Sequence, residues 1–318
     1  MKDLPVQSNG LDADFDLSNL IETVIEGVSA AQSFRQLTFE GPLSVETTRL
    51  DTISDENHMS DDVVVILEID WQSSWIFNSQ ISNWRRILIN LFQNALKYTE
   101  FGYVQVRLTA YETTDGQVAK LSVVDSGKGI SSDYLKYELW TPFVQEDPMS
   151  IGTGLGLSIV GKLVDELDGT IDISSTVGAG TVAQVEIPVK HSTAFDEDEE
   201  TDCNKLIRET RDRCQGLSMC LLGLDNYPDP CEIPTDVRSA KDRKMTAIKS
   251  ALANYAGDWF GMIIRKSRSG SYAKGVIFVC LKSQLHRTDR TRQKPLIVFE
   301  DTTRRLDKEE GEFYLTQP

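Results

Sequence analysis

The sequence predicts an α/β protein in which a larger unit of mixed helices and strands precedes a smaller one. Amphipathic segments with helical spacing alternate along the chain with short apolar segments rich in β-branched residues. After Thr193 the acidic run AFDEDEETD interrupts this alternation. We therefore expect a disordered N-terminus over residues 1–15, the larger domain over 16–190, an acidic linker over 191–204 and the smaller unit over 205–318.

The composition is that of a globular protein with apolar cores. Hydrophobic residues make up 40% of the 318, and the mean hydropathy is -0.28. A formal net charge of -16 and a pI near 4.7 argue against a surface that binds nucleic acid or anionic membrane. A nucleotide can still bind, because backbone amides and local dipoles decide binding on that scale.

Signals for export and membrane insertion are missing from the sequence pattern. No apolar run approaches the ~20 residues that cross a bilayer, and the N-terminal MKDLPVQSNGLDADFD lacks the apolar core of a secretory signal. The five cysteines all lie in the C-terminal part of the chain and form no CxxC pair. We expect reduced thiols and a cytoplasmic location.

Periodicity places the elements of both units. Helices are predicted behind Asp16 as N-cap, from Ser79 to Tyr98 and from Leu155 to Leu167. Strands of the larger domain are predicted at DVVVILEID, YVQVRLTAY, AKLSVVD, TIDISST and TVAQVEIPV. In the smaller unit, LSMCLLGLD, FGMIIRK, GVIFVCLK and PLIVFED read as strands and the stretch near Lys244–Tyr255 as a helix.

The motif RRILINLFQNALKYT lies on the second predicted helix. Asn90, Asn94, Lys97 and Tyr98 follow one another at helical spacing, so they share one face. Amide oxygens and an ammonium group suit a divalent cation that carries a polyphosphate. Any one of these residues alone would be read as an ordinary polar surface residue.

The segment VVDSGKGI follows a predicted strand. Asp125 at its end can accept a hydrogen bond from an exocyclic amine, and Gly127 and Gly129 let the backbone turn tightly toward a flat base. Taken alone, DSGKG would be read as a hairpin turn.

Two further glycine segments complete the set. In GTGLGLSIV, Gly152, Gly154 and Gly156 open a helix whose free amides suit phosphate oxygens. The segment lacks the lysine and hydroxyl residue that end a P-loop, and it follows no predicted strand, which argues against a dinucleotide fold. VGAGT joins two strands as a hairpin, where Thr181 could place a hydroxyl near the base.

Together these motifs resemble the catalytic and ATP-binding domain of histidine kinases. NLFQNALKYT, DSGKGI, WTPFVQED, GTGLGLSIV and VGAGT occur in the order and spacing of that family's N box, first glycine box, F box, second glycine box and closing glycine motif. The resemblance covers about residues 15–190, and the motifs are similar in style to those of fungal hybrid sensor histidine kinases. It implies the Bergerat fold, a two-layer α/β sandwich with a mixed sheet, helices on one face and a flexible lid over the nucleotide.

The resemblance also implies ATP and Mg²⁺ as cofactors and a role for each motif residue. Asn94 would ligate Mg²⁺ with Asn90 in support, and Asn90, Asn94 and Lys97 form the implied catalytic set. Lys97 and Tyr98 would meet the phosphates, and Asp125 would hold the adenine amine. The rest of the implied nucleotide site comprises Gly127, Gly129, Ile130, Phe143 in a lid over 142–151, Gly152, Thr153, Gly154, Leu155, Gly156, Leu157 and Thr181.

Asn90 bears on the choice between kinase and ATPase. Gyrase, MutL and Hsp90 ATPases, which share the implied fold, place a water-activating glutamate four residues before the metal-binding asparagine. The amide of Asn90 cannot act as a general base at neutral pH. The resemblance therefore implies transfer of the γ-phosphoryl group to a separately presented nucleophile.

No histidine of the sequence has the context of the family's phosphoacceptor. His58, His191 and His286 lack its helical apolar flank and adjacent acid. The helix expected over residues 17–34 resembles the segment that leaves the phosphoacceptor hairpin, so the chain is expected to begin just after that module. We expect ATP·Mg²⁺ binding without autophosphorylation, and as partners a phosphoacceptor hairpin, in cis or in trans, and a downstream receiver domain.

Receiver domains often follow this domain in hybrid kinases, so the smaller unit is compared with one. Asp225 offers an acidic residue after the first strand, but GVIFVCLKS ends in Lys282 and Ser283 without the phosphoacceptor aspartate. A fifth strand and its lysine cannot be assigned. A degenerate receiver used for contacts and an unrelated α/β unit both stay open.

Three functions stay open at this stage. The leading one is the catalytic region of a histidine kinase. The second is an ATP-responsive interaction protein without phosphotransfer, and the third, disfavoured by Asn90, is a slow ATPase.

Overall fold

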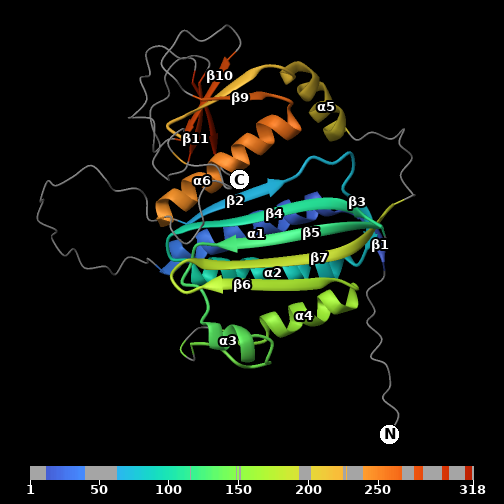
Figure 1. The fold of residues 1–318 in the computed structure, drawn as a ribbon, viewed down its shortest axis with the longest axis vertical. Helices are drawn as coiled ribbons and strands as arrows, with labels where there is room; N and C mark the ends of the chain where they lie inside the picture. Colours follow the sequence, from blue (N-terminus) through green and yellow to red (C-terminus); the bar gives the residue numbers. More distant parts are fainter. Residues whose placement is uncertain are drawn as a thin grey trace, which may run out of the picture.

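A computed structural model gives the fold of the chain (Figure 1). It describes residues 12–39, 63–192 except 115, 148 and 150–151, then 202–224, 227, 239–266, 276–281, 296–300 and 312–316. The predictions for His58, His286, Asp225, Lys282 and Ser283 concern residues outside this set. The described part contains a seven-stranded and a five-stranded sheet, which confirms the α/β class.

The seven-stranded sheet belongs to the larger unit. Its strands, in spatial order, are β1 (Ala13–Asp16), β3 (Ile76–Ser79), β7 (Gly180–His191), β5 (Gly116–Asp125), β4 (Gly102–Thr113) and β2 (Val63–Ile69), while β6 (Thr170–Thr176) also pairs with β7. Only β2 and β4 run parallel, so the sheet is mixed as predicted. In β5, Ala119, Leu121 and Val123 are buried on one face, the alternation expected of a sheet with one core side.

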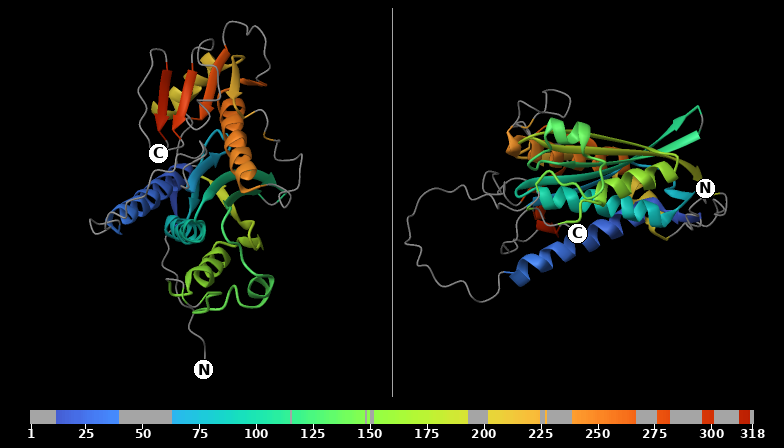
Figure 2. Two further views of the ribbon diagram at one scale, coloured as in Figure 1. Left: turned by 90° about the vertical axis from the view of Figure 1, so that its left-hand side faces the viewer. Right: turned by 90° about the horizontal axis from the view of Figure 1, so that it is seen from below.

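Three helices cover that core face of the sheet (Figure 2). They are α1 (Leu17–Phe39), α2 (Ile81–Tyr98) and α4 (Gly156–Glu166), and their apolar residues share one buried cluster with the strands. Asp16 caps α1 as predicted, because its Oδ1 accepts a 3.0 Å hydrogen bond from the Asn19 amide. The short α3 (Ser132–Tyr137) follows β5. None of the described helices is long and apolar enough to cross a membrane.

The N-terminal part of this unit differs from the prediction. Disorder was expected up to residue 15, but Ala13–Asp16 form β1, which pairs antiparallel with β3. The pairing partner lies more than 60 residues away in the chain. Local polarity therefore gave no sign of a strand that depends on a distant partner.

The smaller unit is built on the five-stranded sheet. Its elements are α5 (Asp202–Cys214), β8 (Ser218–Leu222), α6 (Ala240–Asn254), the π-helical turn η2 (Tyr255–Trp259), β9 (Ile263–Arg265), β10 (Val276–Leu281), β11 (Leu296–Glu300) and β12 (Glu312–Thr316). All its strand pairs are parallel, in the order β9-β8-β10-β11-β12. Counted within the unit, this is the 2-1-3-4-5 order of flavodoxin-like folds.

Two details of the smaller unit correct the sequence reading. The expected linker ran to residue 204, but α5 begins at Asp202, because the segment DCNKLIRETRDRC is rich in helix formers despite its charge. The fifth strand, which the sequence could not assign, is β12. It pairs in parallel with β11, the strand before it in the chain.

Helix α6 lies between the two sheets (Figure 2). A single buried cluster joins its residues to β2 and β4 of the larger unit and to β8 and β10 of its own; the members include Val64, Ile66, Tyr103, Leu221, Met245, Ile248, Val279 and Leu281. The outer face of the larger sheet, which the two-layer expectation left bare, is therefore covered in part by the smaller unit.

Candidate functional site

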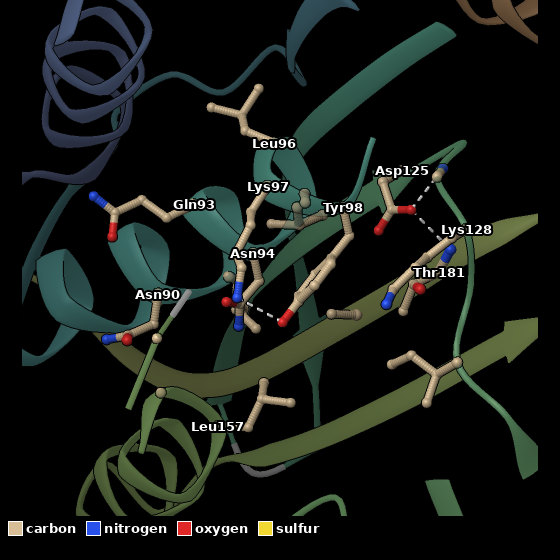
Figure 3. A pocket seen from close by; sticks show the side chains of 18 of the residues that line it. Asn90, Gln93, Asn94, Leu96, Lys97, Tyr98, Asp125, Lys128, Leu157 and Thr181 are labelled. Atoms are coloured by element: carbon tan, nitrogen blue, oxygen red, sulfur yellow. Dashed lines mark hydrogen bonds between the residues drawn. The ribbon is translucent and has the colours of Figure 1, made fainter. Parts of the chain in front are cut away.

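A cavity of about 1250 Å³ opens between α2, the N-terminal end of α4 and the ends of β5 and β7 (Figure 3). Its volume exceeds the roughly 300–1,000 Å³ of ordinary ligand pockets, which leaves room for a nucleotide with its metal and water. The predicted residues that line it are Asn90, Asn94, Lys97, Tyr98, Asp125, Gly127, Gly129, Ile130, Gly152, Thr153, Gly154, Gly156, Leu157 and Thr181. Motifs separated by up to 91 positions in sequence thus meet in one place.

The asparagine face of α2 meets the start of α4. The side chain of Asn90 donates from Nδ2 to the Arg86 carbonyl at 2.7 Å. A Cβ added at Gly156 would lie 3.1 Å from Asn90 Oδ1 and 3.7 Å from Asn94 Nδ2. A side chain at position 156 would therefore crowd Asn90 and touch Asn94, which favours glycine there.

The N-terminal end of α4 offers donors to an anion. Leu155 occupies the N-cap position, and no side chain caps the helix. The first amides of a helix have no intrahelical acceptor, and the helix dipole favours negative charge at this end. Lys97 adds a cation: its Nζ donates to the Tyr98 hydroxyl at 2.8 Å and would lie 3.4 Å from a Cβ at Gly152. This end of the cavity suits a polyphosphate.

The donor set also fits a magnesium ion that arrives with phosphate. Among the described residues no group of histidines, cysteines and acids could hold a metal by itself. Mg²⁺ commonly takes one or two protein oxygens and fills its other positions with phosphate oxygens and water. The half-buried Asn94, beside the open end of α4, is placed to supply such an oxygen.

Asp125 lies at the opposite end of the cavity, where β5 ends (Figure 3). Its Oδ1 accepts hydrogen bonds from the amides of Gly127 at 2.9 Å and Thr181 at 3.2 Å. Burial raises the pKa of this carboxyl, and the two amide hydrogen bonds oppose that rise. The two bonds fix the carboxylate and leave Oδ2 to accept from a ligand amine.

The turn after Asp125 has no space for side chains. A Cβ at Gly127 would fall 2.2 Å from the Tyr98 carbonyl oxygen. Gly129 has a φ of +72°, and a Cβ there would fall 2.2 Å from the Thr176 carbonyl oxygen. Both glycines therefore let the backbone turn tightly at the Asp125 end of the cavity.

The predicted lid packs on the glycine loop that precedes α4. The Phe143 amide donates to the Gly154 carbonyl at 3.1 Å, and the Tyr134 hydroxyl donates to the Val144 carbonyl at 3.1 Å. The Phe143 side chain is 75% exposed and does not line the cavity, and neither does Leu155. A direct contact of these two residues with a nucleotide stays a prediction.

Many residues at the cavity were not predicted, among them Ser175, which hydrogen-bonds to two of its lining residues. Ser175 accepts from the Ile130 amide at 2.8 Å and shares a 3.0 Å hydrogen bond with the Thr181 hydroxyl. The pairing of β6 with β7 sets Ser175 opposite Thr181, so the hairpin register was the available signal. Arg243 of α6 also lines the cavity, and no motif pointed to it.

A profile of the family described as histidine kinase-, DNA gyrase B- and HSP90-like ATPase matches residues 80–191. The matched span contains every residue predicted for the site. This similarity covers about a third of the chain. The resemblance to histidine kinase catalytic domains is thereby confirmed, and we call this span the ATPase-family domain.

Individual relatives match the ATPase-family domain rather than the whole chain. The autoinducer 2 sensor kinase/phosphatase LuxQ of Vibrio parahaemolyticus is 41% identical over 121 residues, which are 36% of this chain and 14% of that protein. The sensor protein TorS of Escherichia coli K12 is 36% identical over 110 residues, 35% of this chain and 12% of TorS. The chain thus spans only a small part of the length of these relatives.

A solved structure is similar over more of the chain. Full-length ShkA, crystallised in complex with AMPPNP, has a TM-score of 0.57 and covers 91% of this chain and 49% of its own, at 18% identity. At this identity the likeness shows the fold, and it confirms the predicted mixed-sheet architecture.

Proposed function

We propose that the cavity binds ATP with Mg²⁺ and that the chain is the catalytic part of a two-component sensor histidine kinase. In this role it transfers the γ-phosphoryl group of ATP to a histidine on a separate phosphoacceptor hairpin. The observation that carries the proposal is that the two ends of this cavity differ in chemistry. Asp125 lies at one end, and the asparagines and the open start of α4 lie at the other. The sensor-kinase names of the relatives support the same role.

Each end of the cavity would hold one part of the nucleotide. Asp125 accepts a hydrogen bond from the adenine amine, and the glycine turn admits the flat base. Lys97 and the first amides of α4 hold the phosphates. Mg²⁺, held by Asn94 and phosphate oxygens, would neutralise charge that develops on the transferred group. The chain mainly positions the γ-phosphate and screens its charge.

Transfer to a histidine is favoured over hydrolysis. The Asn90 amide, hydrogen-bonded to the Arg86 carbonyl, cannot take a proton from water. His191, the one histidine among the described residues, ends β7 and packs against Phe77 with ring centroids 4.9 Å apart. It has no helical context, and the sequence around His58 and His286 lacks the apolar flank and adjacent acid of a phosphoacceptor. We therefore infer that the acceptor histidine lies outside this chain and that the chain does not phosphorylate itself.

The smaller unit fits a receiver-like domain that has lost its phosphoacceptor. Its parallel 2-1-3-4-5 strand order supports this assignment. Lys282 and Ser283 follow β10 where a receiver has its aspartate. A separate receiver downstream would then take the phosphoryl group. Cys214 is a thiol outside any disulfide, which agrees with the proposed cytoplasmic location.

Phosphotransfer is tested with γ-labelled ATP and Mg²⁺, with and without an added phosphoacceptor hairpin domain from a related kinase. We expect acid-labile label on the hairpin and none on the chain alone. The Asn94→Ala variant should abolish transfer, while Asn78→Ala, at an exposed position of β3 outside the cavity lining, should leave it unchanged. Label on the chain itself, or equal transfer by Asn94→Ala, would contradict the proposal.

A second candidate is an ATP-responsive interaction protein, which the close docking of the smaller unit on the ATPase-family domain favours. In that case ATP would bind and change the exposure of the docked surfaces, but no hairpin would be labelled. The same experiment, run beside a nucleotide-binding measurement, separates the two candidates.

A further inference from the structure

Among the described residues of the smaller unit, Arg243 is the one that lines the nucleotide cavity. This arginine lies near the start of α6 and lines the cavity together with Asp125 and Thr181. Its Nη1 donates to the carbonyl of Ala179, in the turn over residues 177–179 that joins β6 to β7. The site assigned from the motifs is therefore completed by a residue from outside the ATPase-family domain.

The contacted turn belongs to the base end of the cavity. Two residues after Ala179, the Thr181 amide donates to Asp125 Oδ1 at 3.2 Å. The Gly178 amide donates to the Lys128 carbonyl at 2.8 Å, which ties the turn to the DSGKG segment. A shift of the turn would displace the hydrogen bonds that orient the Asp125 carboxylate.

The guanidinium has donor capacity that the protein leaves unused. Nε of Arg243 is buried and has no hydrogen-bond partner among the described residues. Leaving a buried donor of a charged group unpaired is costly, so an acceptor on a ligand, or a water that the ligand orders, would stabilise it. The base end of a bound nucleotide presents ring nitrogens that are such acceptors.

Contacts at the far end of α6 hold this arginine in place. Glu68 of β2 is 1% exposed and accepts from Gln105 Nε2 at 2.7 Å and from Asn254 Nδ2 of α6. The Tyr255 hydroxyl donates to the Leu67 carbonyl at 3.2 Å and accepts from the Ile69 amide at 3.3 Å. These bonds fix the register of α6 on the outer face of the larger sheet.

The same contacts provide hydrogen-bond partners for backbone groups on the outer edge of β2. Strand β2 pairs only with β4, so its outer backbone groups have no strand partner among the described residues. Tyr255 fills part of this gap, and Trp259 Nε1 donates to the Ile69 carbonyl at 2.6 Å. Since unpaired edges invite other partners, covering β2 makes the docked arrangement the stable one.

We propose that Arg243, delivered by the docked α6, is a positioning residue of the nucleotide site that holds the β6–β7 turn against the base. Nucleotide affinity and docking of the smaller unit are then coupled, and by linkage each strengthens the other. The inference rests on the proposed function, because it takes the cavity as the ATP site.

The test compares Arg243→Ala with the wild-type chain in titrations with ATP and with ADP, both with Mg²⁺. We expect affinity to fall ~10-fold, equal to about 1.4 kcal/mol, for both nucleotides, because the contact is with the base end that they share. Lys241→Ala, which removes an exposed charge from the same helix, is the matched control and should change affinity less than ~2-fold. Thermal melts should show both variants folded.

Hydrogen exchange separates positioning from a purely structural role. In the wild type, nucleotide should slow amide exchange in α6 and β2, and in Arg243→Ala this protection should be lost while the apo exchange pattern is kept. Equal affinities of Arg243→Ala and wild type would overturn the inference and leave the proposed function intact. A loss larger for ATP than for ADP would also overturn it, since it would place Arg243 at the phosphates. Absence of nucleotide binding by the wild type would instead refute the proposed function.

Discussion

The two units supply the cavity in different ways. The ATPase-family domain contributes side chains and turns from within a few residues of one another on α2, at the end of β5 and at the start of α4. From the described residues of the smaller unit, one arginine reaches the cavity, because a whole helix is docked on the opposite face of the sheet. Site residues that lie close together in sequence form recognisable motifs. A site residue such as Arg243, which depends on the docking of another unit, belongs to no motif.

The largest expected effect on ATP affinity comes from a substitution in the ATPase-family domain, at the turn after Asp125. Gly127→Ala places a Cβ 2.2 Å from the Tyr98 carbonyl oxygen, so the turn must move. ATP affinity should fall at least ~100-fold, or about 2.7 kcal/mol, measured by calorimetric titration.

The matched control for that variant lies in the smaller unit. Gly257 of η2 has nothing within 4 Å of an added Cβ, so Gly257→Ala should leave ATP affinity within ~2-fold of wild type. Comparable losses in the two variants would mean that the turn at Gly127 does not shape the site.

An intermediate effect is expected where the two units meet. Burial raises the pKa of Tyr255 to about 12, so its hydroxyl is a protonated donor at neutral pH. Tyr255→Phe removes the hydrogen bonds to the Leu67 carbonyl and the Ile69 amide and should lower the free energy of unfolding by about 1–2 kcal/mol in urea titrations. ATP affinity should fall only ~2- to 3-fold, because α6 keeps its apolar contacts.

The exposed Tyr137 of α3 provides the control for that change. Tyr137→Phe removes a hydroxyl from a side chain that is 67% exposed and should leave stability unchanged. If Tyr255→Phe were as stable as Tyr137→Phe, the edge contacts would not hold the units together.

The smallest effect concerns the pH dependence of stability. Folding raises the pKa of Asp125, so the folded state holds this proton more tightly and loses stability as pH rises from about 4 toward the raised pKa. Asp125→Asn keeps an oxygen acceptor for the Gly127 and Thr181 amides but carries no charge. The nucleotide-free variant should melt a few degrees higher than wild type at neutral pH, and the difference should vanish in acid.

The matched variant Asp172→Asn, on an exposed position of β6, should melt like the wild type at every pH. An Asp125→Asn variant that melts lower than wild type at neutral pH would contradict the assignment of burial as the dominant cause of the pKa shift.

The ATPase-family domain was largely predictable from the sequence. The helical spacing of the residues around Trp84 and Leu91 gave α2, and the apolar alternation around Leu121 gave β5. The glycines predicted the turns, because a residue without a Cβ marks a tight turn or a close backbone approach in the sequence itself. Fourteen of the predicted site residues line the cavity for this reason.

The remainder required tertiary information. β1 and β3 are short strands that pair with each other across a long sequence separation. Arg243 looks like any charged residue of an amphipathic helix until α6 is placed against the β6–β7 turn. Charge and periodicity predict on which face of its own helix or strand a residue lies. They do not predict which other unit that helix or strand packs against.

The central claim is that one cavity, with Asp125 at its base end and Asn94 at its phosphate end, binds ATP. Its most direct test is the affinity of wild type, Asp125→Asn and Asn94→Ala for ATP in the presence of Mg²⁺. We expect wild type to bind, Asp125→Asn to lose affinity for ATP and ADP alike, and Asn94→Ala to lose the dependence of ATP binding on Mg²⁺. Absence of binding by wild type, or binding untouched by both substitutions, would contradict the account.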